Sequence, residues 1–310
     1  METRSKPWLV AAAFGVLYLV WGSTYLVIRI LVQPEPPMIP PLLLAGSRNI
    51  VAGIILYAFA RSRGTTAPAS AWPLAIVVGF LMLGLGNGGV TFAETRVPSG
   101  LVALLVAAVP LWLGIWESII PPRRRPGAKT IVGIVLGLVA VAWLAGEDAG
   151  WSGPVDPVYV GAVLVGSAGW ALGSILGRGS GVDVFLMSGM QMFAGGIILT
   201  LGGALRGEFT DFHIAAITPV GWAYWLYLTI AGSILAFTAY VWLLRHVRAP
   251  LVGTYAFVNP VVAVTLGAII LAEPLTPRIF VAGAGVVAAV ALVLWDKARR
   301  AAPPPAPAEG

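Results

Sequence analysis

Long apolar stretches separated by short polar connections fill almost the whole chain. A hydrocarbon core about 30 Å thick requires roughly 20 helical residues, and ten stretches come close to that length or exceed it. The ten stretches are residues 8–31, 41–60, 73–95, 98–120, 129–146, 157–177, 183–204, 218–243, 249–271 and 277–296. Because the connections are short and marked by Pro, Gly or charge, consecutive helices are expected to run antiparallel. The pattern predicts an all-α integral membrane protein with ten transmembrane helices.

The two halves of the chain align at a constant offset of 150 residues. Pro110 falls on Pro260, and Gly133 falls on Gly283, without any gap. Each half holds five predicted helices, and an odd number places the second copy upside down in the bilayer. Inverted repeats of this kind are an architecture of secondary transporters. We therefore expect three parts: a first repeat at 1–148, an inverted second repeat at 149–300, and a disordered, low-complexity tail at 301–310.

The positions of Lys and Arg predict the orientation, because both residue types concentrate in cytoplasmic loops. With the N-terminus inside, fourteen of them lie on the cytoplasmic side and three in outer loops, at Arg96, Arg206 and Arg278. Equivalent turns of the two repeats also differ in charge sign, since Arg123 corresponds to Glu273. This predicts a multi-pass protein of the inner (plasma) membrane with both termini in the cytoplasm.

The composition excludes several other classes of protein. Hydrophobic residues make up 58% of the 310 residues and charged residues only 10%, against about 25% charged residues in soluble domains. The net charge is +6, but the Lys and Arg residues lie mainly in the predicted cytoplasmic segments and form no basic stripe. No nucleic-acid partner is therefore expected. Cysteine is absent, which excludes disulfides and cysteine-ligated metals. We expect no cofactor and no metal ion.

Two prolines occupy equivalent positions midway along the fourth and ninth predicted helices. Pro110 and Pro260 each lack an N–H group and disturb the hydrogen bond to the carbonyl four residues earlier. Paired kinks near the middle of the membrane favour a hinge in each helix. The alternative is a static kink that neighbouring helices cover.

Trp21 and Trp170 lie 149 residues apart, at near-equivalent positions of the two repeats. Tryptophan prefers the membrane interface, so two tryptophans at mid-helix positions are unusual. We expect them to face an interior cavity and to enclose an organic substrate; bulky packing between helices is the alternative. Further candidates for this cavity are hydroxyl-bearing neighbours at i+3 or i+4 and a third tryptophan: Thr24, Tyr25, Ser174 and Trp112.

Two asparagines interrupt apolar helices. Tyr255 and Asn259 are four residues apart, directly before Pro260, and Asn87 lies within the glycine-rich run 84–89. A buried asparagine either hydrogen-bonds a neighbouring helix or lines a wet cavity. All three polar residues are candidates for the cavity, with a helix–helix contact favoured for Asn87. The run 84–89 also matches G-x-G-x-x-G, but a transmembrane helix lacks the strand–turn–helix unit of a dinucleotide site.

Arg48 is the most costly residue to bury, because it lies about seven residues into the second predicted helix. Two interpretations stand: a structural ion pair with Glu94 at the end of the third helix, or binding of a substrate carboxylate. Arg29 lies near the same level and is expected to extend its side chain to the interface. No Asp or Glu lies at mid-helix, so Glu94 is the candidate carrier if transport is coupled to protons; without coupling the protein is a facilitator. A Walker A motif is absent, so ATP does not drive transport directly.

Several short motifs, in a fixed order, resemble the EamA-type carriers of the drug/metabolite transporter (DMT) superfamily. The matching stretches are Trp21–Tyr25 with Ile28-Arg29, Pro40-Pro41 with Arg48, Gly86-Asn87 with Glu94, Val97–Gly100 with Val109-Pro110, and Tyr255–Val261 with Glu273-Pro274. They cover nearly the whole chain. The resemblance implies ten helices in two inverted repeats around a central cavity, and alternating access that moves small metabolites, most often outward.

The tryptophan-rich interior resembles the branch of this superfamily that exports amino acids, including aromatic ones. We therefore expect a secondary transporter that exports small metabolites, foremost amino acids or their derivatives, either as a monomer or as a dimer. A multidrug, organic-cation or lipid-linked metabolite exporter is the alternative. An enzyme is not expected, because the sequence holds no nucleophile–base pair and no metal-binding motif.

Overall fold

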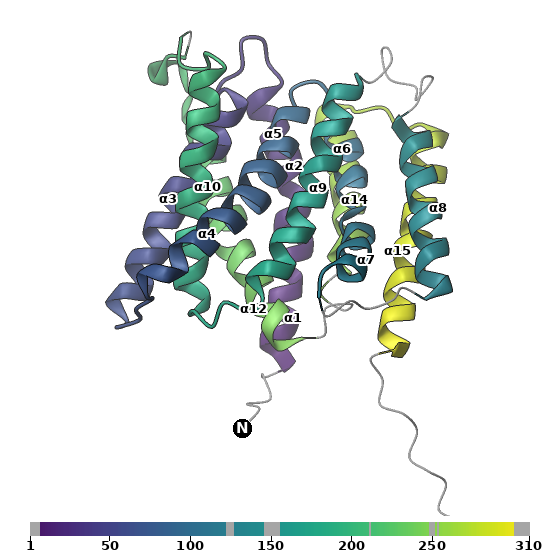
Figure 1. The fold of residues 1–310 in the computed structure, drawn as a ribbon. Helices are drawn as coiled ribbons and strands as arrows, with labels where there is room; N and C mark the ends of the chain where they lie inside the picture. Colours follow the sequence, from purple (N-terminus) through teal and green to yellow (C-terminus); the bar gives the residue numbers. More distant parts are fainter. Residues whose placement is uncertain are drawn as a thin grey trace, which may run out of the picture.

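The computed structural model describes residues 7–121, 127–145, 156–210, 212–247, 252 and 254–300. These residues form a bundle of helices, with no β-strand among them (Figure 1). A helix lies in each of the ten predicted stretches. The predicted tail at 301–310 and the predicted repeat boundary after residue 148 lie outside the described residues.

Several helices follow one another without a loop, so one long helix can carry two or three labels. The first half of the chain contributes α1 (Pro7–Gly15), η1 (Val16–Trp21), α2 (Gly22–Val32), α3 (Pro41–Ser62), η2 (Ala69–Ala71), α4 (Trp72–Gly79), η3 (Phe80–Asn87), α5 (Gly88–Ala93), α6 (Ser99–Val106), α7 (Val109–Ile119) and α8 (Ala128–Ala145). The second half contributes α9 (Pro157–Gly177), α10 (Val184–Leu205), η4 (Ile214–Ala216), α11 (Pro219–Tyr227), η5 (Leu228–Ala236), α12 (Phe237–His246), α14 (Tyr255–Leu271) and α15 (Pro277–Arg300).

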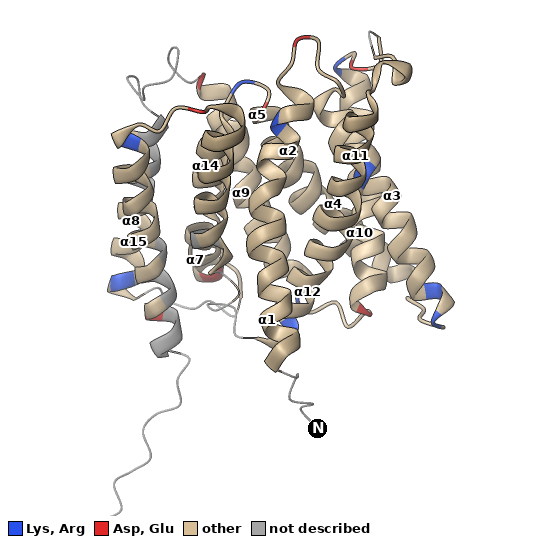
Figure 2. Cartoon of the chain, turned by 180° about the vertical axis from the view of Figure 1, so that it is seen from behind, with Lys and Arg blue, Asp and Glu red and all other residues tan. Residues whose placement is uncertain are grey.

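Seven long helices of the described residues have the length and apolar composition needed to cross a membrane. They are Pro7–Val32, Pro41–Ser62, Ala69–Ala93, Ser99–Ile119, Pro157–Gly177, Val184–Leu205 and Pro219–His246. The other three predicted spans hold shorter apolar helices, within α8, α14 and α15. Charged residues gather toward the two ends of the bundle and leave its middle layer almost free of charge (Figure 2). The described part of the chain is thus all-α, and its helices have the length and composition of membrane-spanning helices.

Proline and short polar side chains start several of the helices. Pro41, Pro157 and Pro219 occupy first turns, where a backbone N–H group would have no partner within the helix. Asp183 caps α10, because its carboxylate accepts hydrogen bonds of 2.9 and 3.1 Å from two N–H groups of the first turn. These local signals explain why the predicted and observed starts of these helices agree within one residue.

The helices α3 and α10 pack backbone against backbone through glycine. A Cβ atom added to Gly53 would lie 2.9 Å from the carbonyl oxygen of Gly189, and one added to Gly196 would lie 2.9 Å from that of Gly46. Side chains cannot approach a backbone so closely, so glycine is required on both helices. This contact is the most extensive between any two helices of the described chain.

Three long helices contain a π-helical segment at mid-length. These segments are η1, η3 and η5, in the first, third and eighth predicted spans. A π-helical turn hydrogen-bonds residue i to residue i+5, widens the helix and often marks a functional site. The three segments contribute Trp21, Asn87 and Ser233 to one interior cavity.

The two equivalent prolines differ in structure. Pro110 lies in the first turn of α7, and the fourth predicted span breaks at 107–108, between α6 and α7. The break follows from the missing N–H group of Pro110, which leaves the carbonyl of Val106 without its usual donor. Pro260 instead lies in the second turn of α14, which continues through it. Matching breaks are not observed, and a hinge at either proline stays a prediction.

Candidate functional site

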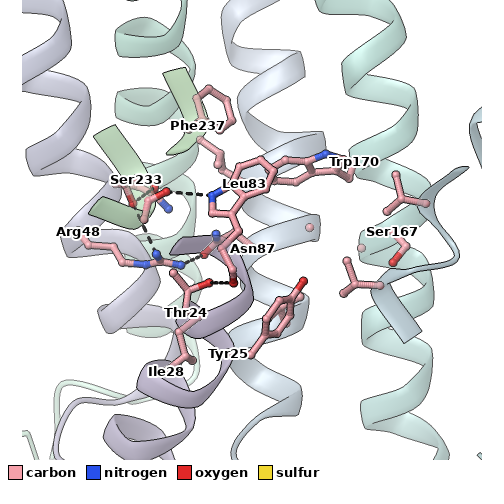
Figure 3. Close-up of a pocket in the computed structure, with 18 of the residues that line it drawn as sticks. Thr24, Tyr25, Ile28, Arg48, Leu83, Asn87, Ser167, Trp170, Ser233 and Phe237 are labelled. Atoms are coloured by element: carbon pink, nitrogen blue, oxygen red, sulfur yellow. Dashed lines mark hydrogen bonds between the residues drawn. The ribbon is translucent and has the colours of Figure 1, made fainter. Parts of the chain in front are cut away.

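A cavity lies inside the bundle, where the three π-helical segments meet. The space open to the centres of water-sized molecules is about 80 Å³, enough for several waters, so the cavity is more than a dry packing defect. Most of its wall is apolar, but charged, amide and hydroxyl side chains also reach it (Figure 3). The wall includes Trp21, Arg48, Asn87, Trp170, Ser233 and Tyr255.

Aromatic rings from both halves of the chain form one side of this cavity. Trp21, Trp170 and Tyr255 line it, and Tyr240 packs against all three. Neighbouring ring centroids lie 5.2 to 5.8 Å apart. The indole N–H of Trp21 donates to the carbonyl of Gly232 at 3.0 Å, which holds the ring in place. The rings offer apolar faces and electropositive edges to a flat organic group.

Arg48 brings a positive charge into the cavity wall. The residue is only 2% exposed. Its Nη2 donates to Oδ1 of Asn87, and its Nη1 donates to Oγ of Ser233 at 3.5 Å. Its Nε has no hydrogen-bond partner among the described residues. The guanidinium is therefore held by two neutral oxygen atoms, one from η3 and one from η5.

The expected ion pair between Arg48 and Glu94 is not formed. The ion pairs seen within the described part of the chain do not involve Arg48. Glu94 is fully buried, and neither of its carboxylate oxygens has a hydrogen-bond partner in the described residues. The ion-pair interpretation of Arg48 is therefore wrong for this conformation. The guanidinium of Arg48 has no carboxylate within ion-pair distance among the described residues.

Arg29 makes an ion pair and two hydrogen bonds with other parts of the protein. Its Nε pairs with Glu273 at 3.2 Å, and its Nη1 donates to the carbonyls of Glu94 and Val97 at 2.7 and 2.9 Å. Glu273 also accepts hydrogen bonds from the backbone N–H and the hydroxyl of Ser99, at 2.9 to 3.0 Å. The two charged side chains are only 11% and 9% exposed. This ion pair ties α2 and the start of α6 to the connection after α14.

The structure separates the predicted site residues into two groups. Those that line the cavity are Trp21, Thr24, Tyr25, Arg48, Asn87, Trp170 and Tyr255. Those outside its lining are Glu94, Trp112, Ser174 and Asn259. Trp112 packs against an apolar cluster that also contains Tyr25, and Asn259 is buried within α14. Ser174 lines a smaller second cavity, where it hydrogen-bonds Tyr240 at 3.0 Å.

The comparisons with known proteins agree with this architecture. The profile of the EamA-like transporter family matches the chain twice, at residues 7–146 and 158–295. The chain belongs to the EamA-like transporter family. Its relatives include the uncharacterized inner membrane transporter YedA of Escherichia coli, 38% identical over 303 residues, which cover 96% of this chain and 94% of the relative. The uncharacterized transporter YvbV of Bacillus subtilis is 26% identical over 298 residues, which cover 94% of each protein.

A solved crystal structure has the same fold as this EamA-like chain. The two structures align with a TM-score of 0.67 at 19% sequence identity, over 96% of this chain and all of the other. At that identity the likeness concerns the fold alone.

Several cavity residues of this EamA-like protein are missing from the sequence-based set. They include Asn49, Ser167, Gly232, Ser233 and Phe237. Asn49 follows Arg48 in an apolar helix, and Gly232 and Ser233 interrupt an apolar run. Both pairs could therefore have been recognised in the sequence as breaks in an apolar stretch. Ser167 and Phe237 have no such sequence signal, because serine and phenylalanine are common in transmembrane helices.

Proposed function

We propose that this EamA-like protein is a secondary transporter of the inner membrane that exports small carboxylate metabolites, foremost amino acids and their derivatives. The observation that carries this proposal is Arg48, a buried guanidinium at the cavity whose hydrogen-bond partners are neutral. A buried charge is costly without a counter-charge. A carboxylate is the matching ligand for a guanidinium, because their hydrogen bonds are charge-assisted and can form in pairs.

The aromatic side of the cavity supports amino acids with apolar or aromatic side chains. Trp21, Trp170 and Tyr255 can enclose such a group while Arg48 binds the carboxylate. An organic cation, the alternative cargo, would bring a second positive charge next to Arg48 and is therefore disfavoured.

We infer that the chain forms ten spans in two inverted repeats, at 1–148 and 149–300. Four of the five spans in the first half contact their counterparts in the second half: α3 packs on α10, α6 on α14, α8 on α15, and Trp21 of the first span on Trp170 of the sixth. A two-fold axis in the membrane plane produces such pairs. The start of α1 and the end of α15 also lie at the same end of the bundle (Figure 1). The distribution of Lys and Arg supports a cytoplasmic location for that end.

Two ion pairs at opposite ends of the bundle support alternating access. Arg29 and Glu273 join the first and ninth spans at 3.2 Å, and Arg178 and Glu117 join the sixth and fourth spans at 3.6 Å. Arg178 follows Arg29 by 149 residues, the same interval that separates the two tryptophans. Both pairs are formed in this structure, and in the proposed cycle each pair opens in turn when its own end of the bundle opens. Pro110 and Pro260 are the proposed hinges.

The test is counterflow of radiolabelled solutes into liposomes that contain the purified full-length protein, without ATP. The probes are L-phenylalanine, which carries both a carboxylate and an ammonium group, and 2-phenylethylamine, which carries only the ammonium group. We expect saturable counterflow of phenylalanine and little of the amine. Faster counterflow of the amine would favour the organic-cation alternative. Counterflow of neither compound, with correctly inserted protein, would overturn the proposal for amino acids.

A further inference from the structure

Glu94 is a fully buried carboxyl group to which the proposed transport cycle gives no role. It directly follows α5, is 0% exposed, and has no hydrogen-bond partner for either carboxylate oxygen among the described residues. An ionised carboxylate in such a place costs far more free energy than the neutral acid, because water no longer solvates its charge. Burial without hydrogen-bond partners therefore favours binding of a proton at Glu94.

Glu94 lies one helical turn beyond the cavity. Asn87 and Val90 line the cavity and precede Glu94 by seven and four residues. This spacing places all three residues on one face of their helix. The carboxyl group of Glu94 therefore continues the face of the helix that lines the cavity.

The charged and titratable groups whose electric fields act on Glu94 come from three elements. They are Tyr25 and Arg29 of α2, Arg48 of α3, and Glu273 after α14. Arg29 already pairs with Glu273 at 3.2 Å. Arg48 has only neutral hydrogen-bond partners. The Arg48 guanidinium is thus the positive group that remains to balance the charge of an ionised Glu94.

We propose that Glu94 is a proton-binding site linked to carboxylate binding at Arg48. When Glu94 releases its proton, its negative charge competes with the solute carboxylate for the Arg48 guanidinium. When the proton returns to the carboxylate oxygen, that competition ends and the guanidinium is free for the solute. Proton and solute therefore favour each other's binding, and this coupling acts equally in both directions.

The consequence is cotransport, which rests on the transport function proposed above. Each carboxylate solute crosses the membrane together with a proton, and both move in the same direction. Export of a carboxylate solute down its own gradient then carries protons outward.

The experiment follows proton movement and solute exchange in the same liposomes. Vesicles that contain the wild-type protein, a trapped pH-sensitive dye and L-phenylalanine are diluted into phenylalanine-free buffer. We expect the internal pH to rise as phenylalanine leaves. Glu94→Gln mimics the protonated acid, so it should keep phenylalanine counterflow within about twofold of wild type, while its proton movement falls to that of protein-free vesicles.

The matched control is Glu35→Gln, which removes an exposed carboxyl group paired with Arg96; it should leave both readouts unchanged. Glu94→Asp keeps a titratable group and should retain proton movement. Three outcomes would each overturn the proposal. The wild-type protein could release phenylalanine without proton movement, protons could move in the direction opposite to the solute, or Glu94→Gln could move protons as the wild type does. Loss of counterflow in both Glu94 variants would overturn it as well.

Infrared spectroscopy separates this proposal from the transport function itself. A protonated buried carboxyl group gives a carbonyl band that should disappear in Glu94→Gln. If wild type shows this band but no counterflow of phenylalanine, the transport proposal fails and the proton site stands. If the band is absent from wild type, the proton site fails.

Discussion

Trp21 and Trp170 meet edge to face, with their ring centroids 5.7 Å apart and their planes at 81°. They come from near-equivalent positions of the two halves, 149 residues apart in the sequence. Both rings also pack on Tyr240, so the halves of the chain meet at an aromatic layer beside the cavity. Residues at near-equivalent positions of the two halves are thus in direct contact in the bundle.

Trp170→Ala should lower phenylalanine counterflow by roughly tenfold, because it removes an aromatic surface that would enclose the solute. Trp8→Ala is the control, since that tryptophan is exposed at the start of α1, and it should transport at the wild-type rate. If Trp170→Ala and the wild type transport phenylalanine at equal rates, the aromatic rings are not part of the binding site.

Arg48→Ala should lower phenylalanine counterflow by about ten- to a hundredfold, because a hydrogen bond to a charged group contributes about 1.5–3 kcal/mol. The methyl ester of phenylalanine lacks the carboxylate, so its residual transport should change much less. Arg61→Ala, at the exposed end of the same helix, is the control. An equal loss for acid and ester would show that Arg48 supports the cavity without binding the carboxylate.

Glu273→Gln should lower the free energy of unfolding by about 1–2 kcal/mol, because Arg29 loses its counter-charge and the start of α6 loses a charged cap. Glu35→Gln breaks the Glu35–Arg96 pair, whose side chains are 68% and 60% exposed, and should have almost no effect. Thermal unfolding in detergent measures both. Similar midpoints for the two variants would contradict a structural role for the Arg29–Glu273 pair.

Gly53→Ala should reduce stability by about 1–3 kcal/mol, because its Cβ atom would lie 2.5 Å from the backbone nitrogen of Phe193. Gly161→Ala is the matched control in another helix, since nothing lies within 4 Å of its added Cβ atom. That variant should be neutral or slightly stabilised, because alanine favours a helix more than glycine does. The measurements are the yield of monodisperse protein and its thermal midpoint for both variants. An unchanged midpoint for Gly53→Ala would contradict the close contact between α3 and α10.

The candidate site could be predicted only in part. Trp21, Trp170 and Arg48 stand out in the sequence because each is unusual in the middle of an apolar helix, and all three line the cavity. Their contacts follow from no local signal. Arg48 bonds Ser233, 185 residues away, and Arg29 pairs with Glu273 from the other half of the chain.

The positions of the helices could be predicted from local features, because hydrophobic length, proline in first turns and capping carboxylates act within a few residues of each other. The sequence also marked which polar residues are costly to bury. Other outcomes became visible in the folded bundle: Arg48 and Glu94 do not pair, Ser174 and Asn259 lie outside the cavity lining, and Pro110 breaks its helix while Pro260 does not. Those outcomes depend on helix rotation and on contacts between distant spans, which helical periodicity alone does not specify.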